Sequence, residues 1–587
     1  MTVVRPLLST LFASTFAVFA IAGGAFAKDG DKPKLLPGKS LAGNYLAARI
    51  AGTDRDLESA AAFYRQAILL DPENVDIKQR AFQTFVSNGD FEEAVELGRE
   101  LGKIDAAPEI ARIVLAVNDM RSKSWTGAQR QLEHNWRSAI DRLVAGLMLA
   151  WSQVGEGKVE KALATADGLT GPAWFDLFVQ YHSGLIALQG AEPAEGIARL
   201  EKAFANKAGG QGSNYTYMRA IQSLAQAYWK SGDKERAKAM VLQAKRIQPQ
   251  NPVFDAMLAL IESGKGLASP IAKAQRGASE VFLNLGTALN KDGGEQFARI
   301  YLQLANMLAP DDDAVTMQLA DLYDQQGLPT PANDLFATVV PSSPFYRIAQ
   351  LEIAINLDAG DNLDAAREIF DTLVASDPDD ITAHLSYSAV LSRHEMFDQS
   401  IPVLERLVAR IAEPRRFHWS VFYRLGIAYE RTKQWDKAEK IFYKALDLYP
   451  DQPSVLNYLG YSWVDMNINL EEGLELIRKA VEIRPNDGYM VDSLGWAYYK
   501  LGRFEEAVAD LERAVELRPA DPTINDHLGD AYWMTGRKLE ATFQWRHALS
   551  LDPLKEDIPK IEAKLENGLN NDMPKTVEDP DAKPDNG

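Results

Sequence analysis

The spacing of four prolines is the feature that most constrains what this chain can fold into. They close four successive segments at intervals of 35, 34 and 34 residues, and an alanine lies five residues before each of them. The prolines are Pro450, Pro485, Pro519 and Pro553. A fixed period of this length is typical of repeat architectures, in which each unit buries its apolar face only against its neighbours. The C-terminal third is therefore predicted to be an array of similar units.

Each unit also contains a Leu–Gly pair. The pairs are Leu425-Gly426, Leu459-Gly460, Leu494-Gly495 and Leu528-Gly529. Small residues at fixed positions let two helices of a unit approach closely, and the proline ends the second helix because it cannot continue it. The large residue one turn before the alanine (Phe442, Leu511 or Trp545) is expected to fill the gap to the next unit. A bulky residue at Gly495 is predicted to cost about 1–3 kcal/mol by overpacking.

Three of the four units have a tyrosine three residues after the glycine and a further alanine. These are Tyr429 and Ala438, Tyr498 and Ala507, and Tyr532 and Ala541. The order of Leu-Gly, Tyr, Ala, bulky apolar residue, Ala and Pro resembles the tetratricopeptide repeat (TPR) family. The resemblance implies an all-α fold, a right-handed superhelical solenoid of helix-turn-helix units. It also implies that the first helix of each unit lines a concave groove.

The pattern weakens toward the N-terminus but continues. Good matches end at Pro249 and Pro310, fair ones end near Pro344 and Pro378, and three degenerate units lie between about 107 and 205. The resemblance gives roughly 14 repeats in all and covers about nine tenths of the chain beyond residue 27. Gly502 and Gly536 are expected in turns within the repeats, where glycine can adopt a positive φ.

The first 27 residues are predicted to be a cleavable signal peptide. Arg5 precedes an uncharged run from Leu7 to Gly23, and the small residues Ala25 and Ala27 stand before Lys28. The alternative is that the run is retained as an N-terminal anchor, because it is close to the shortest length that can span a membrane. With cleavage, the mature chain begins at Lys28 and holds no integral membrane span.

The rest of the chain is predicted to divide into six parts. These are a flexible segment (28–40), a degenerate N-terminal repeat array (41–206), a middle array (213–412), a consensus C-terminal array (418–553), a capping helix (554–569) and a disordered acidic tail (570–587). Flexible joints are expected at the glycine-containing segments Gly209 to Ser213 and Glu262 to Ser269. An amphipathic closing helix is expected because a solenoid must cover its last apolar face.

The composition argues against several classes of function. Lys and Arg number 63 and Asp and Glu 82, which gives a net charge of -19, so nucleic acid is not expected as a partner. The absence of cysteine excludes disulfides, thiolate metal sites and a lipidated N-terminal cysteine. The seven histidines form no metal-binding motif, and no phosphate-binding loop or nucleophile elbow occurs. We therefore expect no enzyme activity, no metal and no cofactor.

The groove implied by the resemblance is the candidate binding site for protein or peptide partners. Aromatic rings supply buried area, while amides and carboxylates bind backbone groups or basic side chains, so a basic or neutral partner is favoured. The candidate residues, expected to be exposed on the first helices of the last four units, are Tyr423, Glu430, Arg431, Asn457, Tyr461, Asp465, Asp492, Trp496, Tyr499, Asp526, Asp530 and Trp533. The alternative is that some rings, in particular Tyr461 and Trp496, pack against the neighbouring repeat.

The sequence therefore predicts a non-enzymatic scaffold or adaptor in the periplasm of a Gram-negative bacterium. Residues 457–553 look like the C-terminal repeats of envelope adaptors that bind carboxyl-terminal processing proteases, although such adaptors are often lipoproteins and this chain has no cysteine. One alternative is a scaffold for outer-membrane, polysaccharide or secretion machinery. Another is a repeat-bearing enzyme of the glycosyltransferase type. A third is a cytoplasmic or membrane-tethered assembly factor, if the signal peptide does not function.

Overall fold

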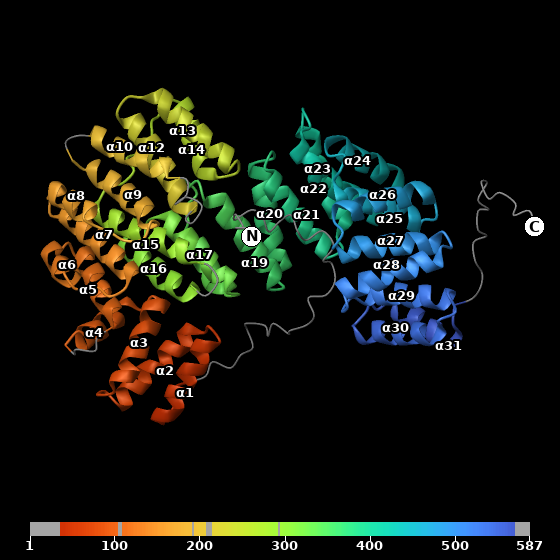
Figure 1. Cartoon of the computed structure of the whole chain (residues 1–587), viewed down its shortest axis with the longest axis horizontal. Helices are drawn as coiled ribbons and strands as arrows, with labels where there is room; N and C mark the ends of the chain where they lie inside the picture. The colour runs from red at the N-terminus through yellow and green to blue at the C-terminus, as the bar shows by residue number, and fades with distance from the viewer. Residues whose placement is uncertain (1–35, 104–107, 191–192, 207–213, 291–293, 570–587) are drawn as a thin grey trace, which may run out of the picture. The chain divides into compact units, whose positions relative to one another are not determined.

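The computed structural model describes residues 36–103, 108–190, 193–206, 214–290 and 294–569. Within these ranges the chain forms thirty α-helices and one short 3-10 helix, and no strand (Figure 1). The predicted all-α helix-turn-helix solenoid is therefore confirmed, and the helices account for the roughly 14 helix pairs and closing helix expected from the repeats. The predicted signal peptide, the joint at 209–213 and the acidic tail lie outside the described residues.

The helices fall into two compact units that meet between Asn362 and Leu363. This division coincides with none of the predicted array boundaries. The N-terminal unit contains α1 (Leu41–Thr53), α2 (Leu57–Leu70), α3 (Val75–Asn88), α4 (Phe91–Leu101), α5 (Glu109–Arg121), α6 (Trp125–Leu132), α7 (Ala139–Gly155), α8 (Val159–Asp167), α9 (Phe175–Ala187), α10 (Pro193–Ala205), α12 (Asn214–Lys230), α13 (Lys234–Ile247), α14 (Pro252–Glu262), α15 (Ala274–Leu289), α16 (Glu295–Leu308), α17 (Asp313–Gln325), α18 (Pro329–Phe336) and α19 (Tyr346–Ala359).

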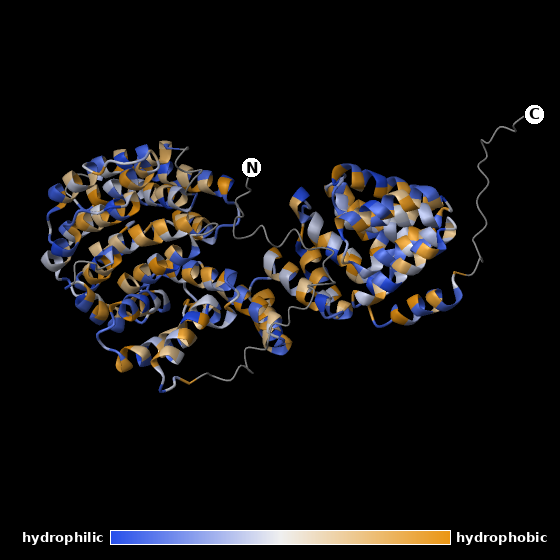
Figure 2. Ribbon diagram, turned by 60° about the horizontal axis from the view of Figure 1, so that its bottom comes forward, coloured by the Kyte–Doolittle hydropathy of each residue, from blue (hydrophilic) through white to orange (hydrophobic). Residues whose placement is uncertain are grey.

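The C-terminal unit contains the four consensus repeats. Its helices are α20 (Leu363–Ser376), α21 (Ile381–Arg393), α22 (Phe397–Arg410), the 3-10 helix η2 (Arg416–His418), α23 (Trp419–Arg431), α24 (Trp435–Leu448), α25 (Pro453–Asp465), α26 (Leu470–Ile483), α27 (Gly488–Lys500), α28 (Phe504–Leu517), α29 (Pro522–Met534), α30 (Lys538–Ser550) and α31 (Ile558–Asn567). In both units each helix carries hydrophobic and hydrophilic residues (Figure 2), and the hydrophobic ones supply the buried clusters between helices.

The ends of the consensus helices follow from local residue chemistry. The Asp521 side chain accepts hydrogen bonds from the backbone N–H groups of Thr523 and Ile524 at the start of α29, and Asp487 caps α27 in the same way. Gly502 and Gly536 end the first helices with φ of 75° and 81°. The prediction that these glycines occupy turns with positive φ is confirmed.

The large residues of the repeat pack against the glycine of their own unit. A Cβ atom at Gly426 would lie 2.5 Å from the Phe442 ring, and one at Gly529 would lie 2.5 Å from the Trp545 ring. Each large side chain therefore fills the space left by the glycine of its own unit, and Phe442 also packs on the next unit, where its ring centroid lies 5.4 Å from that of Tyr458. The reason is that the two helices of a unit cross at the glycine, so the ring one turn before the alanine covers that crossing.

The aromatic residue three positions after the glycine connects consecutive units. The Tyr532 hydroxyl donates to Glu512 on the preceding α28 at 2.8 Å, and the Trp463 indole N–H donates to Glu439 on the preceding α24 at 2.8 Å. The apolar part of each ring is buried while its polar atom is satisfied. This contact explains why the position prefers an aromatic residue with a donor, and why tryptophan can replace tyrosine there.

In the N-terminal unit, α15 and α16 pack against the first helices of earlier repeats. Helix α15 contacts α7, α9 and α12, and α16 contacts α3 and α5. Figure 1 shows α15 and α16 beside these helices. A Cβ atom at Gly277 of α15 would lie 2.3 Å from the Trp151 ring of α7, so only glycine permits this approach. The face that the family resemblance assigns to partners is therefore covered here by the chain itself.

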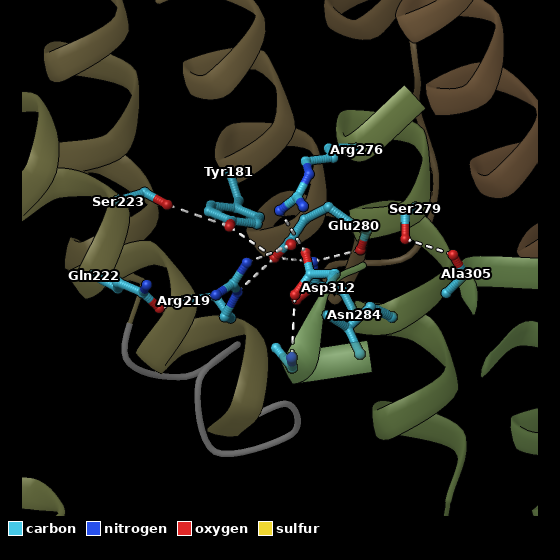
Figure 3. A network of polar contacts seen from close by, with 12 residues as sticks. Tyr181, Arg219, Gln222, Ser223, Arg276, Ser279, Glu280, Asn284, Ala305 and Asp312 are labelled. Carbon is cyan, nitrogen blue, oxygen red and sulfur yellow. Dashed lines mark hydrogen bonds and ion pairs between the residues drawn. The ribbon is translucent and has the colours of Figure 1, made fainter. Parts of the chain in front are cut away.

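A buried network of polar side chains joins α9, α12 and α15 (Figure 3). The Glu280 carboxylate forms a two-point ion pair with Arg219, at 2.6 Å and 2.9 Å, and accepts a hydrogen bond from the Tyr181 hydroxyl at 2.9 Å. The Asn284 amide donates to the same carboxylate at 3.1 Å. Since the Glu280 side chain is only 2% exposed, these donors replace the water that the carboxylate has lost. The network positions α15 on the earlier repeats.

Candidate protein-binding face of the C-terminal unit

The predicted site residues lie on one side of α23, α25, α27 and α29, which we call the first-helix face. Each position on this face can be counted from the glycine of its repeat. Three residues before the glycine stand Tyr423, Asn457, Asp492 and Asp526. One residue after it stand Ile427, Tyr461, Trp496 and Asp530. Four residues after it stand Glu430, Val464, Tyr499 and Trp533.

Side chains on this face contact their counterparts in the next repeat in a regular order. The residue three positions before one glycine meets the residue two positions before the next. The Asn457 amide donates to Ser493 at 3.2 Å, and the Asp492 carboxylate lies 2.9 Å from Nδ1 of His527. Tyr423 and Tyr458 make the same step with their rings, whose centroids are 6.0 Å apart. We call this series of contacts the inter-repeat ladder.

The ladder buries several residues that were expected to be exposed. The exposed fractions are 1% for Tyr423, 3% for Asn457, 7% for Asp492 and 4% for Asp530. The expectation of exposed side chains is wrong at these four positions, because each side chain is used in contacts with neighbouring helices. Glu430, Tyr461, Trp496, Tyr499, Asp526 and Trp533 are half-buried, and Arg431 and Asp465 are exposed.

Three aromatic rings stack across two repeats. The Trp496 ring lies parallel to Tyr499, with centroids 4.8 Å apart, and parallel to His527, with centroids 4.0 Å apart. Packing against the neighbouring repeat, which was the alternative for Trp496, is therefore part of its role. Burial and the carboxylates of Asp530 and Asp526 raise the pKa of Tyr499. The half-buried rings thus lie among acidic groups.

The closing helix α31 occupies the last part of this face. The Lys564 ammonium lies 2.8 Å from the Asp526 carboxylate and 2.7 Å from that of Asp530. The Trp545 indole donates to Asp530 at 2.8 Å, and a Cβ atom at Gly568 would lie 2.1 Å from the Trp533 ring. Lys564 therefore continues the ladder after α29. The chain itself covers Asp526, Asp530 and Trp533, three residues predicted to hold a partner.

Three family models match this chain, and each describes tetratricopeptide repeats. A TPR repeat model matches residues 495–536, and Tetratricopeptide repeat models match residues 420–451, 42–74 and 219–251. The matched segments cover helix pairs in both units, including α1–α2, α12–α13 and α23–α24, and the last four repeats share the inter-repeat ladder. The chain therefore contains tetratricopeptide repeats in both units.

Relatives of this chain align over parts of its length. TPR repeat-containing protein PA4667 of Pseudomonas aeruginosa is 28% identical over 196 residues, which are 33% of this chain and 32% of that protein. BBSome complex member BBS4 of Bos taurus is 30% identical over 89 residues, which are 15% and 17% of the two chains. The alignments thus span a third or less of each relative. A chain of the APC/C hetero-tetramer Cut9-Hcn1 aligns over 91% of this chain and 97% of its own, at 14% identity and a TM-score of 0.38.

The described residues hold no candidate metal site and no candidate membrane span. No group of three or more His, Asp or Glu side chains among them is placed to hold a metal ion. None of the described helices is both long and apolar enough to cross a membrane. The repeats present carboxylates and half-buried aromatic rings on this face.

Sequence reasoning missed three residues on this face. His527 and Lys564 are ladder members, and Arg424 is a half-buried cation that makes no ion pair with any described residue. The repeat period places Arg424 and His527 at the same position, two residues before the glycine, so an alignment of the repeats could have found them. Lys564 follows the last repeat proline and has no equivalent in that alignment.

The unfolding free energy of the C-terminal unit should depend on pH through His527 and Asp530. Burial opposes the charged form of His527, but the carboxylates of Asp492, Asp526 and Asp530 outweigh it and raise the pKa of His527 above 6.5. Burial also raises the pKa of Asp530 above 3.8, against the opposing effect of Lys564. A histidine whose pKa is higher in the folded state than in the unfolded state stabilises the folded state below pH 6.5. This stabilisation is lost as the pH rises through the folded-state pKa. An aspartate whose pKa is raised in the folded state likewise favours folding at low pH.

We therefore expect the C-terminal unit to lose roughly 1–2 kcal/mol of unfolding free energy between pH 4.5 and pH 7.5 through these two groups. Urea titrations at both pH values should measure this difference, and it should shrink in the His527→Gln variant. Equal pH slopes in the variant and the natural protein would contradict the assignment. The matched control is the His547→Gln substitution, which removes an exposed histidine of the same unit.

Proposed function

We propose that this protein is a non-enzymatic scaffold whose C-terminal first-helix face holds a partner segment carrying basic side chains. One observation carries the proposal: the face already binds an ammonium group, that of Lys564, between the carboxylates of Asp526 and Asp530. Half-buried rings next to these carboxylates supply contact area. A lysine or arginine of a partner would meet the same chemistry in the preceding repeats.

The part of the face that remains available lies upstream of α31. Tyr461, Trp496 and Tyr499 are half-buried there, and Asp465 is exposed. Burial, followed by the carboxylates of Asp492, Asp465 and Glu430, raises the pKa of Tyr461, so its hydroxyl also lies among acidic groups. These residues favour an extended peptide or a helix that alternates apolar and basic side chains.

The proposed mechanism is the concentration of partners on one surface. A scaffold that holds two partners converts their encounter into an effectively intramolecular event. In the N-terminal unit the first helices contact α15 and α16, which supports the C-terminal unit as the place where partners bind.

For the cellular role, we propose an adaptor in the bacterial envelope, with a periplasmic processing protease and its substrates as partners. The support is the predicted signal cleavage after Ala27 and the likeness of residues 457–553 to such adaptors. A mature N-terminus at Lys28 and periplasmic fractionation would support export. A scaffold for outer-membrane, polysaccharide or secretion machinery is the second candidate, and the identity of cross-linked partners distinguishes the two.

Replacing both Tyr461 and Tyr499 by alanine should weaken partner binding at least tenfold, because each half-buried ring is expected to contribute about 1–2 kcal/mol to binding. The measurement is fluorescence anisotropy with labelled peptides that alternate Lys or Arg with Leu or Phe, and with acidic versions of the same peptides. The control is Tyr443→Ala, which removes a ring that is 48% exposed on the second helix α24.

The proposal requires that the basic peptides bind and that the acidic versions do not. It also requires helicity in the double variant to equal that of the control. Equal affinity of the double variant and the natural protein for the basic peptides would refute the assigned face, whereas failure of every peptide to bind would refute the proposed partner chemistry.

A further inference from the structure

A pocket on the N-terminal unit is lined by three cationic side chains. It lies between α4, α5 and α6 and has a volume of about 380 Å³, within the range of small-molecule sites. Arg99 lies on α4, Lys103 in the turn that follows, and Arg112 on α5. Gln131 of α6 adds an amide, and Leu115 of α5 adds an apolar wall.

None of the residues that line the pocket is acidic. Several carboxylates of the same helices are already paired with cations that do not line it. Glu92 lies 2.8 Å from Arg121, Glu100 lies 2.7 Å from Lys78, and Glu109 lies 3.8 Å from Arg137. Within the described parts of the chain, Arg99, Lys103 and Arg112 form no ion pair.

Two other carboxylates on α4 and α5 do not neutralise the positive charge of the pocket. The charges of Arg130 and Arg99 act on Asp119 of α5, but Asp119 does not line the pocket. Glu96 is exposed on α4 and does not line it either. Three like charges that share one concavity repel one another, and they stand together in a chain whose net charge is -19.

The ends of the helices explain only part of this arrangement. Cations near the C-terminal end of a helix are favoured by its dipole, which accounts for Arg99 and Lys103 at the end of α4. It does not account for Arg112, which lies in the first turn of α5. At that end of a helix the dipole disfavours a cation, so a third positive charge facing the other two requires another reason.

We propose that this pocket binds a small organic anion with several negative charges, held through its phosphate or carboxylate groups. The two guanidinium groups can each form a two-point contact with such a group, and the Lys103 ammonium adds a further charge. The Gln131 amide can donate to the same anion, and Leu115 can contact its carbon skeleton. This site is independent of the first-helix face and of the partner proposed for it.

The test is isothermal titration of the full chain with two probes, inorganic pyrophosphate and citrate, at 0.15 M NaCl. Saturable binding of at least one probe is expected, and Arg112→Gln should weaken it at least tenfold. Lys161→Gln, which removes an exposed cation on α8, should leave the affinity unchanged. Preference for pyrophosphate would identify the ligand as a phosphate compound, and preference for citrate as a carboxylate compound.

A second variant, Gln131→Glu, guards against a folding defect in Arg112→Gln. It places a carboxylate among the three cations, so it should raise the melting temperature of the free protein and abolish binding of both probes. Absence of saturable binding by the natural protein would overturn the proposal. Binding by Gln131→Glu or by Arg112→Gln with the natural affinity would overturn it as well.

Discussion

Replacing Arg219 by alanine should lower the unfolding free energy of the N-terminal unit by about 3–5 kcal/mol. The substitution removes both charged contacts to Glu280, whose side chain is 2% exposed, and leaves its carboxylate with only the Tyr181 and Asn284 donors. An uncompensated buried charge costs more than the lost ion pair contributes. The measurement is urea unfolding followed by near-ultraviolet circular dichroism.

A pH signature separates this effect from a simple loss of packing. Burial favours the neutral form of Glu280, and Arg219 is the main group that opposes it, so the pKa of Glu280 is lowered in the natural protein. Without Arg219 the carboxyl should bind a proton on folding, and the loss of stability should be smaller at pH 4.5 than at pH 7.5. Adding Glu280→Gln to the variant should restore part of the stability.

The matched control is Lys238→Ala, which breaks an exposed ion pair with Glu262. Both partners in that pair are at least 41% exposed, so the cost should stay below about 1 kcal/mol. If Arg219→Ala cost no more than this control, the buried network would not be what holds α15 on the earlier repeats.

Replacing Gly460 by alanine should cost the C-terminal unit about 2–4 kcal/mol. The added Cβ atom would lie 2.6 Å from the backbone oxygen of Gly473, so the two helices α25 and α26 would have to separate. In the other consensus repeats an alanine stands at the position of Gly473, and a large side chain covers the place where the two helices cross. At the crossing of α25 and α26 the two backbones are in contact. Backbone atoms cannot rotate away as a side chain can.

Alanine substitutions at two other glycines should cost less stability than Gly460→Ala. A Cβ atom at Gly495 would meet the side chain of Leu511, and not a backbone atom, at 2.6 Å, so Gly495→Ala should cost less than Gly460→Ala. At Gly98 of α4 the nearest atom would be 3.4 Å away, and alanine there should be neutral or stabilising by up to about 1 kcal/mol. Chemical denaturation of the three variants gives the order, and equal losses at Gly460 and Gly98 would contradict it.

The sequence predicted the fold because its strongest pattern reports local geometry. Gly426, Gly495 and Gly529 mark helix crossings, the prolines mark helix ends, and Gly502 and Gly536 mark turns. Each of these residues acts within one repeat, so its role can be inferred from residue type and spacing alone.

The candidate site was harder to predict because its geometry depends on neighbouring repeats. Tyr423 and Asp492 look like exposed positions within a single helix, yet contacts with the next repeat bury them. The position of Lys564 between Asp526 and Asp530 depends on how the chain turns after the last repeat. The contact of Gly277 with Trp151 joins residues more than a hundred positions apart, and no short pattern records it.

The packing of α15 and α16 on earlier repeats has a consequence for how the two units can change during evolution. In the C-terminal unit each repeat contacts mainly its neighbours, so a repeat can be duplicated or lost while the remaining contacts persist. In the N-terminal unit α16 contacts α3 and α5, and α15 contacts α7 and α9, so the number of repeats between them is fixed. Adding or deleting one there would displace every later contact. The N-terminal unit should therefore unfold as one cooperative block, and length variation should be confined to the C-terminal repeats.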